Sequence, residues 1–181
     1  MPLRALAVAL PLSALVWAGC SKQAEKEDIV PEASFSVEYP ALPVTIDSAT
    51  VAGPSGAVLE LDNNVLAQAL QAKQYTPGQL TEFTFTKARL YFSTPVNSSY
   101  NSVKSVAVKL AVGDAAPVTI AKLPAVPNGA QTLLLDLTGA DVLQAVKSGH
   151  ARIVFTMEFD GPMPPVSTHM LVLDARVKVS L

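Results

Sequence analysis

Two carboxylates and a histidine near the end of the chain are the residues whose types best suit acid–base chemistry. Glu158 and Asp160 share one face of an expected strand, so their carboxylates could lie side by side, as in glycoside hydrolases. A hydrolase would also need His169 to converge with them in one pocket. However, Glu158 alternates with apolar neighbours like any solvent-facing residue, and Asp160 begins an ordinary Asp-Gly turn. We therefore predict that the protein is not an enzyme, and a hydrolase is the weakest alternative.

A second group of polar side chains offers oxygen atoms that suit calcium. Glu60, Asp62, Asn63 and Asn64 lie close together, but the ordered ligand spacing of an EF-hand loop is missing. Capping of a helix that begins here explains Asp62 to Asn64 more simply. We predict no metal site. The alternative is a calcium-binding module, for which Asp62, Asn63 and Asn64 are the candidate ligands.

Other motifs of catalysis or cofactor binding are absent from the sequence. It contains no H-x-H, H-x-x-x-H or C-x-x-C pair for a metal, no G-x-S-x-G nucleophile motif, and no glycine-rich nucleotide loop. The two histidines, His150 and His169, flank an expected hairpin, which suggests that they lie at the same end of the domain. We expect both to be structural, and we predict no cofactor.

The single cysteine, Cys20, lies where an apolar run stops and a charged run begins. The segment before it has one basic residue, Arg4, followed by an apolar stretch from Ala5 to Ala18. That stretch has the length of a secretory signal core and is short for a helix that spans a bilayer. The small residues Ala18 and Gly19 precede the cysteine, as a signal peptidase requires.

The sequence LVWAGC resembles the signal of bacterial lipoproteins, although Trp17 stands where that motif usually has leucine. The resemblance implies that Cys20 receives a diacylglycerol thioether and becomes the first residue after cleavage. Ser21 resembles the sorting signal for the outer membrane in bacteria that retain lipoproteins with aspartate at that position. The alternative is a conventional signal peptide with an incidental Cys20.

Three segments follow from these observations: a signal peptide over 1–19, the lipidated cysteine and a flexible tether over 20–34, and one domain over 35–181. The formal net charge is −2, and the basic residues are scattered singly. This distribution argues against nucleic acid as a partner and against electrostatic attachment to anionic lipid. Aromatic residues make up only 6% of the chain, which counts modestly against glycan binding.

The domain is dominated by short segments in which apolar residues recur at every second position. The last of these segments would direct the following residues inward: Leu171, Leu173, Ala175, Val177 and Val179. Helical spacing occurs over 63–74 and again over 138–149, where Thr138 could cap the start and Gly149 the end. Alternating apolar and polar residues give a strand one face in the core and one face in water, which is typical of antiparallel sheets. We predict an all-β fold, a two-sheet antiparallel β-sandwich with one or two short helical inserts, and a closed β-barrel is the alternative.

Two segments carry more specific predictions. Phe83 and Phe85 share one face of a long strand, whereas Leu90 falls on the opposite parity, so we expect a β-bulge near Lys87 to Arg89. The segment QTLLLDL, residues 131–137, is expected to be a strand that is buried on both faces or close to it.

Two loops, NSSYNS and GPMPPVS, each carry one large side chain, Tyr100 and Met163. Loops at the ends of a sandwich commonly meet partners, so these two residues are candidate ligand contacts. The sequence thus predicts a non-catalytic lipoprotein of the cell envelope, held at the membrane by its anchor and placed at the outer membrane. Its partner would be an envelope protein or a glycan, and a calcium- or carbohydrate-binding module is the alternative.

Overall fold

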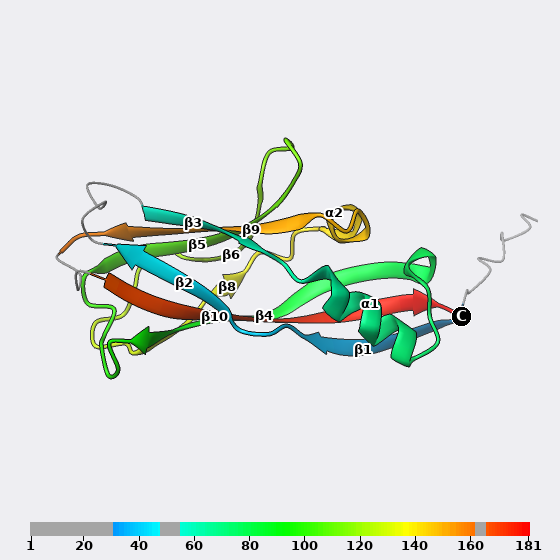
Figure 1. Ribbon diagram of the computed structural model, residues 1–181, viewed down its shortest axis with the longest axis horizontal. Coiled ribbons are helices and arrows are strands. Elements are labelled where there is room, and N and C mark those ends of the chain that lie inside the picture. Colours follow the sequence, from blue (N-terminus) through cyan, green and yellow to red (C-terminus); the bar gives the residue numbers. More distant parts are fainter. Residues whose placement is uncertain (1–30, 48–54, 162–165) are drawn as a thin grey trace, which may run out of the picture.

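The protein forms two facing antiparallel sheets, as predicted from the alternating apolar pattern (Figure 1). The computed structural model describes residues 31–47, 55–161 and 166–181. Cys20, the segment over 1–30 and Met163 lie outside these residues. In the part of the chain that the structure describes, each sheet has five strands, and the sheets do not close into a barrel. Within the described ranges, no helix is long and apolar enough to cross a membrane.

The first sheet, sheet A, is built on two long antiparallel strands. These are β4 (Leu80–Thr94) and β10 (Val166–Ser180), which lie side by side over almost their whole length. Three shorter strands complete sheet A: β1 (Glu32–Glu38), β2 (Leu42–Asp47) and β7 (Thr132–Leu134). Strands β1 and β2 follow one another along the same edge of β10, and β7 pairs with the other side of β4.

The second sheet, sheet B, covers one part of sheet A, and helices cover another (Figure 1). In the order β3-β9-β5-β6-β8, its strands are β3 (Ser55–Glu60), β9 (Ala151–Phe159), β5 (Val103–Val112), β6 (Val118–Leu123) and β8 (Asp136–Leu137). The helical elements are α1 (Asn63–Ala72), the 3-10 turn η2 (Pro77–Gln79) and α2 (Leu143–Lys147). Helix α1 contacts β1 and α2 contacts β4, so both helices add apolar residues to one continuous core.

The inward face of β10 confirms the predicted alternation. Leu171, Leu173, Ala175, Val177 and Val179 are all fully buried. The outward side chains between them include Asp174 and Lys178, which form ion pairs across the strands with Lys87 and Glu82 of β4. The alternation follows from strand geometry, because successive side chains point to opposite faces of a sheet.

Strand β4 contains the predicted change of face. Phe85 pairs with Ala175 and Lys87 pairs with Asp174, so Thr86 is an extra residue in the register. The buried positions before and after it have opposite parity: Phe83, Phe85, Ala88 and Leu90. The bulge is confirmed, and it lies one residue before the predicted stretch. Its consequence is that the odd-numbered residues after Thr86 point outward.

The segment 131–137 corrects the sequence-based expectation of a strand buried on both faces. Its first half, β7, pairs with β4 in sheet A, and its second half, β8, pairs with β6 in sheet B. Leu133 and Leu135 are buried, but the side chain of Leu134 between them is 68% exposed. The prediction was wrong because the segment passes along the side of the sandwich from one sheet to the other. Only one of its faces therefore meets the core.

The element ends differ in small ways from those predicted. Strand β1 begins at Glu32, three residues before the domain start expected at Phe35. Helix α2 is shorter than the expected helix over 138–149. The hydroxyl of Thr138 does not cap it but donates to the carbonyl oxygen of Thr119 at 2.6 Å. Gly149 follows the helix with a φ of 72°, which suits its predicted role in ending it.

Candidate functional site

The residues of the hypothetical hydrolase site do not converge. Glu158 is exposed, accepts a hydrogen bond from the Ser105 hydroxyl at 3.0 Å, and lies 3.8 Å from the ammonium of Lys104. Asp160 is exposed beyond the end of β9, whereas His169 is fully buried. Since a catalytic group must reach its substrate, these three side chains do not form one active site.

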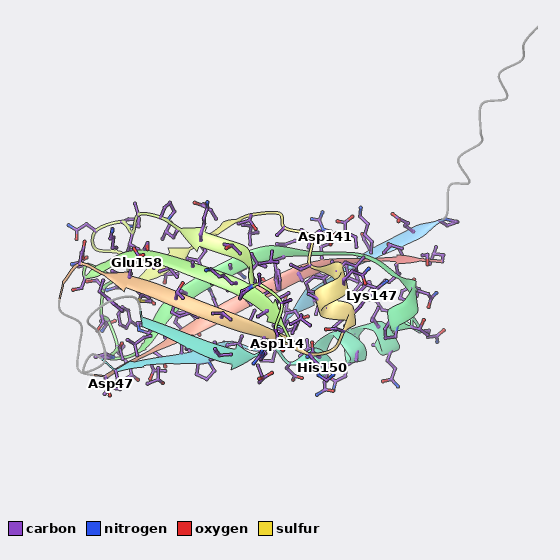
Figure 2. All side chains as sticks on the ribbon, turned by 90° about the horizontal axis from the view of Figure 1, so that it is seen from above. Asp47, Asp114, Asp141, Lys147, His150 and Glu158 are labelled. Carbon is purple, nitrogen blue, oxygen red and sulfur yellow. The ribbon has the colours of Figure 1, made fainter. Side chains whose placement is uncertain are left out.

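The two histidines also lie apart, contrary to the expectation that they share one end of the domain. Figure 2 shows His150 beside α2 near the middle of the long axis, whereas Asp47 and Glu158 lie toward one end. His169 pairs with Val44 in the strand that ends at Asp47. The expectation failed because β9 runs from Ala151 to Phe159, so the chain travels the length of this strand away from His150 before it enters β10 and reaches His169.

His169 belongs to a buried hydrogen-bonded cluster. Its Nε2 atom lies 2.9 Å from the hydroxyl of Ser167, and its Nδ1 atom lies 3.2 Å from the hydroxyl of Tyr100. All three residues have 0% exposure. Burial lowers the pKa of His169 to about 4, so the imidazole is neutral near pH 7. Both ring nitrogens have partners, which gives His169 the structural role predicted for it.

Tyr100 is not the exposed loop contact that the sequence suggested. Its ring packs against Phe92, with ring centroids 4.4 Å apart, and its hydroxyl bonds His169. The backbone of the loop also holds it, because its N–H donates to the carbonyl of Ala130 at 2.8 Å. The polar neighbours of Tyr100 in the sequence indicated an exposed loop. In the structure, this loop places its one large side chain inside the end of the sandwich.

Asp62 and Asn63, two of the candidate calcium ligands, form hydrogen bonds within the protein. The Asp62 carboxylate accepts a hydrogen bond from the Asn64 N–H at 3.0 Å and caps α1, and the Asn63 amide donates to the carbonyl of Gly149 at 2.8 Å. The capping explanation is therefore confirmed. No group of three or more metal-ligating His, Cys, Asp or Glu side chains occurs among the described residues. Asn63 and Asn64 also line a largely apolar pocket of about 240 Å³ between α1 and α2.

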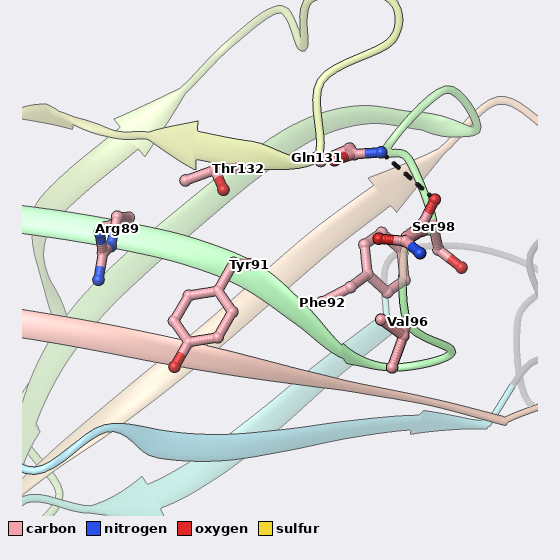
Figure 3. Close-up of a pocket in the computed structure, with 8 residues that line it drawn as sticks. Arg89, Tyr91, Phe92, Val96, Ser98, Gln131 and Thr132 are labelled. Atoms are coloured by element: carbon pink, nitrogen blue, oxygen red, sulfur yellow. Dashed lines mark hydrogen bonds between the residues drawn. The ribbon is translucent and has the colours of Figure 1, made fainter.

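A different place on the molecule has the features of a binding site. A pocket of about 320 Å³ opens beside β4 and the start of β7 (Figure 3). Its lining comes from β4, from the loop that follows β4 and from the start of β7: Arg89, Tyr91, Phe92, Val96, Asn97, Ser98, Gln131 and Thr132. We call it the Arg89 pocket. Arg89 and Tyr91 point outward because the bulge at Thr86 reverses the faces of β4.

Arg89 gives this pocket its charge. Its Nε atom is buried and has no hydrogen-bond partner, and its guanidinium carbon lies 5.5 Å from the ring centroid of Tyr91. Within the described part of the chain, no carboxylate forms an ion pair with it. A guanidinium that lines a pocket without a carboxylate partner offers its charge and its N–H donors to an anion that enters the pocket.

The other end of the pocket is formed by the loop after β4. In Figure 3, Tyr91 lies between Arg89 at one end and Val96 and Ser98 at the other. The amide of Gln131 donates to the Asn97 carbonyl at 3.4 Å, which ties this loop to the start of β7. No acid lines the pocket, and its lining holds no histidine or cysteine.

No protein-family model matches the chain, and no curated protein matches it.

Geometry alone therefore singles out the Arg89 pocket. In the sequence, Arg89 stands out only as part of the expected bulge, and Tyr91 carries no motif. The sequence did contain a pattern that could have indicated the pocket. Arg89 and Tyr91 are two positions apart, so on the solvent-facing side of a strand they form one contiguous surface of a cation and an aromatic ring.

Proposed function

We propose that this protein is a lipid-anchored, non-catalytic lipoprotein of the cell envelope, whose β-sandwich binds a partner through the Arg89 pocket. The anchor is the thioether at Cys20 that the lipobox-like LVWAGC implies, and Ser21 favours the outer membrane. Two or three acyl chains hold a protein stably on a membrane, because each buried methylene contributes about 0.8 kcal/mol.

The placement of the chain ends supports this proposal. The N–H of Leu181 donates to the carbonyl of Pro31 at 2.9 Å, so the start of β1 and the carboxyl terminus lie together (Figure 1). A tether from Cys20 would join the domain at this end. Strand β4 begins at the same end, beside Val179, and runs away from it to Thr94. The Arg89 pocket lies on the distal half of β4, where a membrane would leave it accessible.

The observation that carries the binding role is the unpaired guanidinium of Arg89, which lines the pocket and forms no ion pair with a carboxylate of the described residues. The exposed neighbourhood fits this interpretation, since Val96 at the pocket is 77% exposed and Leu134, which pairs with Arg89, is 68% exposed. Large apolar side chains beside an unpaired cation form the kind of surface that a partner covers.

Photo-crosslinking in the native envelope tests this proposal. A photoreactive amino acid replaces Val96 at the pocket, and a matched chain carries it at Val118, which is 43% exposed on sheet B. We expect a crosslinked partner from position 96 and none from position 118, in the membrane fraction only. Equal crosslinking from both positions, or none from position 96, would refute the pocket as the binding site. A Cys20→Ala chain should lose both membrane association and crosslinking.

A further inference from the structure

We infer that the ligand of the Arg89 pocket is a sugar acid, a saccharide that carries a carboxylate. This inference rests on the binding role proposed above and adds the chemical class of the ligand. Three features of the pocket carry it: the unpaired cation, the aromatic ring beside it, and the neutral hydrogen-bonding side chains around both.

The cation selects a carboxylate. The planar guanidinium of arginine presents a fork of N–H donors that matches the two oxygens of a carboxylate. Arg89 has no ion pair with any acid in the described ranges, and no acid lines its pocket. The nearest outward acid of the adjoining strand, Asp174, is already paired with Lys87 at 3.0 Å. An anion that enters the pocket therefore meets a cation whose charge is not neutralised.

The remaining lining selects a hydroxylated ring. Tyr91 is half-buried, and its ring lies along the pocket between Arg89 and the loop residues (Figure 3). An aromatic face of this kind packs against the apolar face of a sugar ring. Neutral donors and acceptors surround it: Asn97, Ser98, Gln131 and Thr132. Side chains of these types bond hydroxyl groups, which can both donate and accept.

The order of these groups along the pocket gives the binding mode. Arg89 lies at one end, Tyr91 in the middle, and Val96 and Ser98 at the other end (Figure 3). The carboxylate of one sugar residue would meet Arg89 while its ring lies on Tyr91. The next residue of the saccharide would extend toward Ser98 and Gln131. The volume of about 320 Å³ falls at the small end of ligand pockets, which fits one or two sugar residues.

Calorimetric titration of the mature lipoprotein, extracted in mild detergent, tests this inference. The probes are trimers of galacturonate and of glucuronate, the methyl esters of the same trimers, and triglutamate. We expect at least one acid trimer to bind, its ester to bind at least tenfold more weakly, and triglutamate not to bind. The ester is the matched control, because it keeps the sugar rings and their hydroxyl groups and replaces the charged carboxylate by a neutral group.

Variants locate the binding. Arg89→Gln should weaken the acid trimer at least tenfold, and Tyr91→Ala should also weaken it. Arg176→Gln removes the same charge from an exposed position on β10 and should leave affinity unchanged. If neither acid trimer binds, or if the ester binds as well as the acid, the inference is wrong. Tight binding of triglutamate that depends on Arg89 would refute the sugar while leaving the proposed binding role intact. Loss of the crosslink from position 96 would refute that role itself.

Discussion

The hydroxyl of Tyr100 lies 3.2 Å from Nδ1 of His169 inside the core, although the two residues are 69 positions apart. Tyr100 reaches this place from a polar loop, and His169 from the beginning of β10. Together with Ser167 they form a closed polar cluster in which each ring nitrogen of the histidine has a partner. Buried clusters of this kind stabilise a fold only while every member is satisfied.

The stability of the domain should fall as the pH drops below the ordinary pKa of histidine, 6.5. Burial lowers the pKa of His169 to about 4, so between these values the unfolded chain binds a proton that the folded chain excludes. We expect the free energy of unfolding to be constant above about pH 6.5 and to fall by about 1.4 kcal/mol per pH unit below it. Urea denaturation from pH 7.5 to pH 5 should therefore register a loss of about 2 kcal/mol.

In the pH range above 5, the change in the free energy of unfolding can be assigned to His169 and not to the carboxylates. The pKa of Glu82 is lowered from 4.5, first by its hydrogen bond with Lys178, so its contribution is lost only at more acidic pH. His150 is exposed and remains in every variant. A His169→Gln chain should lose most of the slope between pH 6.5 and pH 5. An unchanged slope in that variant would assign the effect to another group.

Removal of the Tyr100 hydroxyl should destabilise the protein. Tyr100→Phe leaves one nitrogen of the buried His169 without a partner, which costs about 1 to 3 kcal/mol. Tyr75→Phe is the matched control, because that ring is only partly buried and stacks on Phe35 with centroids 6.2 Å apart. We expect the control to change the free energy of unfolding, measured in urea, by less than about 0.5 kcal/mol. Equal effects of the two changes would contradict the structural role of the cluster.

The bulge at Thr86 makes a specific prediction about deletions in β4. Deletion of Thr86 makes Phe85 and Lys87 consecutive opposite Ala175 and Asp174, so the register becomes regular and the apolar residues on both sides stay inward. Deletion of Thr84 makes Phe83 and Phe85 consecutive, so they point to opposite faces and one of them turns toward water. We expect the Thr86 deletion to fold and the Thr84 deletion to be unfolded or aggregated, by circular dichroism and gel filtration. The opposite result would show that the register of β4 and β10 differs from the one described.

Adjacent leucines at the side of the sandwich should respond in opposite ways. Leu133 is 1% exposed, so Leu133→Ala should cost about 2 to 5 kcal/mol by leaving a cavity. Leu134 is 68% exposed, and Leu134→Ala should change stability by less than about 0.5 kcal/mol. Thermal or urea unfolding of the two variants measures the difference. Similar losses from both would support a strand that is buried on both faces.

The sequence predicts the faces of the long strands well, because the direction of a side chain in a strand depends on parity alone. The inward residues of β10 and the change of face in β4 followed from that local rule. The path of residues 131–137 did not, since an exposed Leu134 and its buried neighbours are chemically identical. Which sheet each half joins depends on partners far away in the chain.

The site was harder to predict than the fold. The loop that holds Tyr100 is polar, and only contact with His169 and Phe92 reveals that its aromatic ring is buried. Arg89 has no sequence motif, and its importance appears only when the register shows that it faces outward without an acid beside it. Capping by Asp62 was predictable, because helix caps use residues adjacent in the chain.

Intact-mass spectrometry of the protein extracted from its own membranes tests the lipid anchor most directly. We predict a chain that begins at Cys20 and carries a diacylglycerol thioether together with an acyl group on its amine. The Cys20→Ala chain, recovered from the same cells, should lack this added mass and leave the membrane. A free thiol at Cys20, or a chain that still contains residues 1–19, would contradict the proposed anchoring.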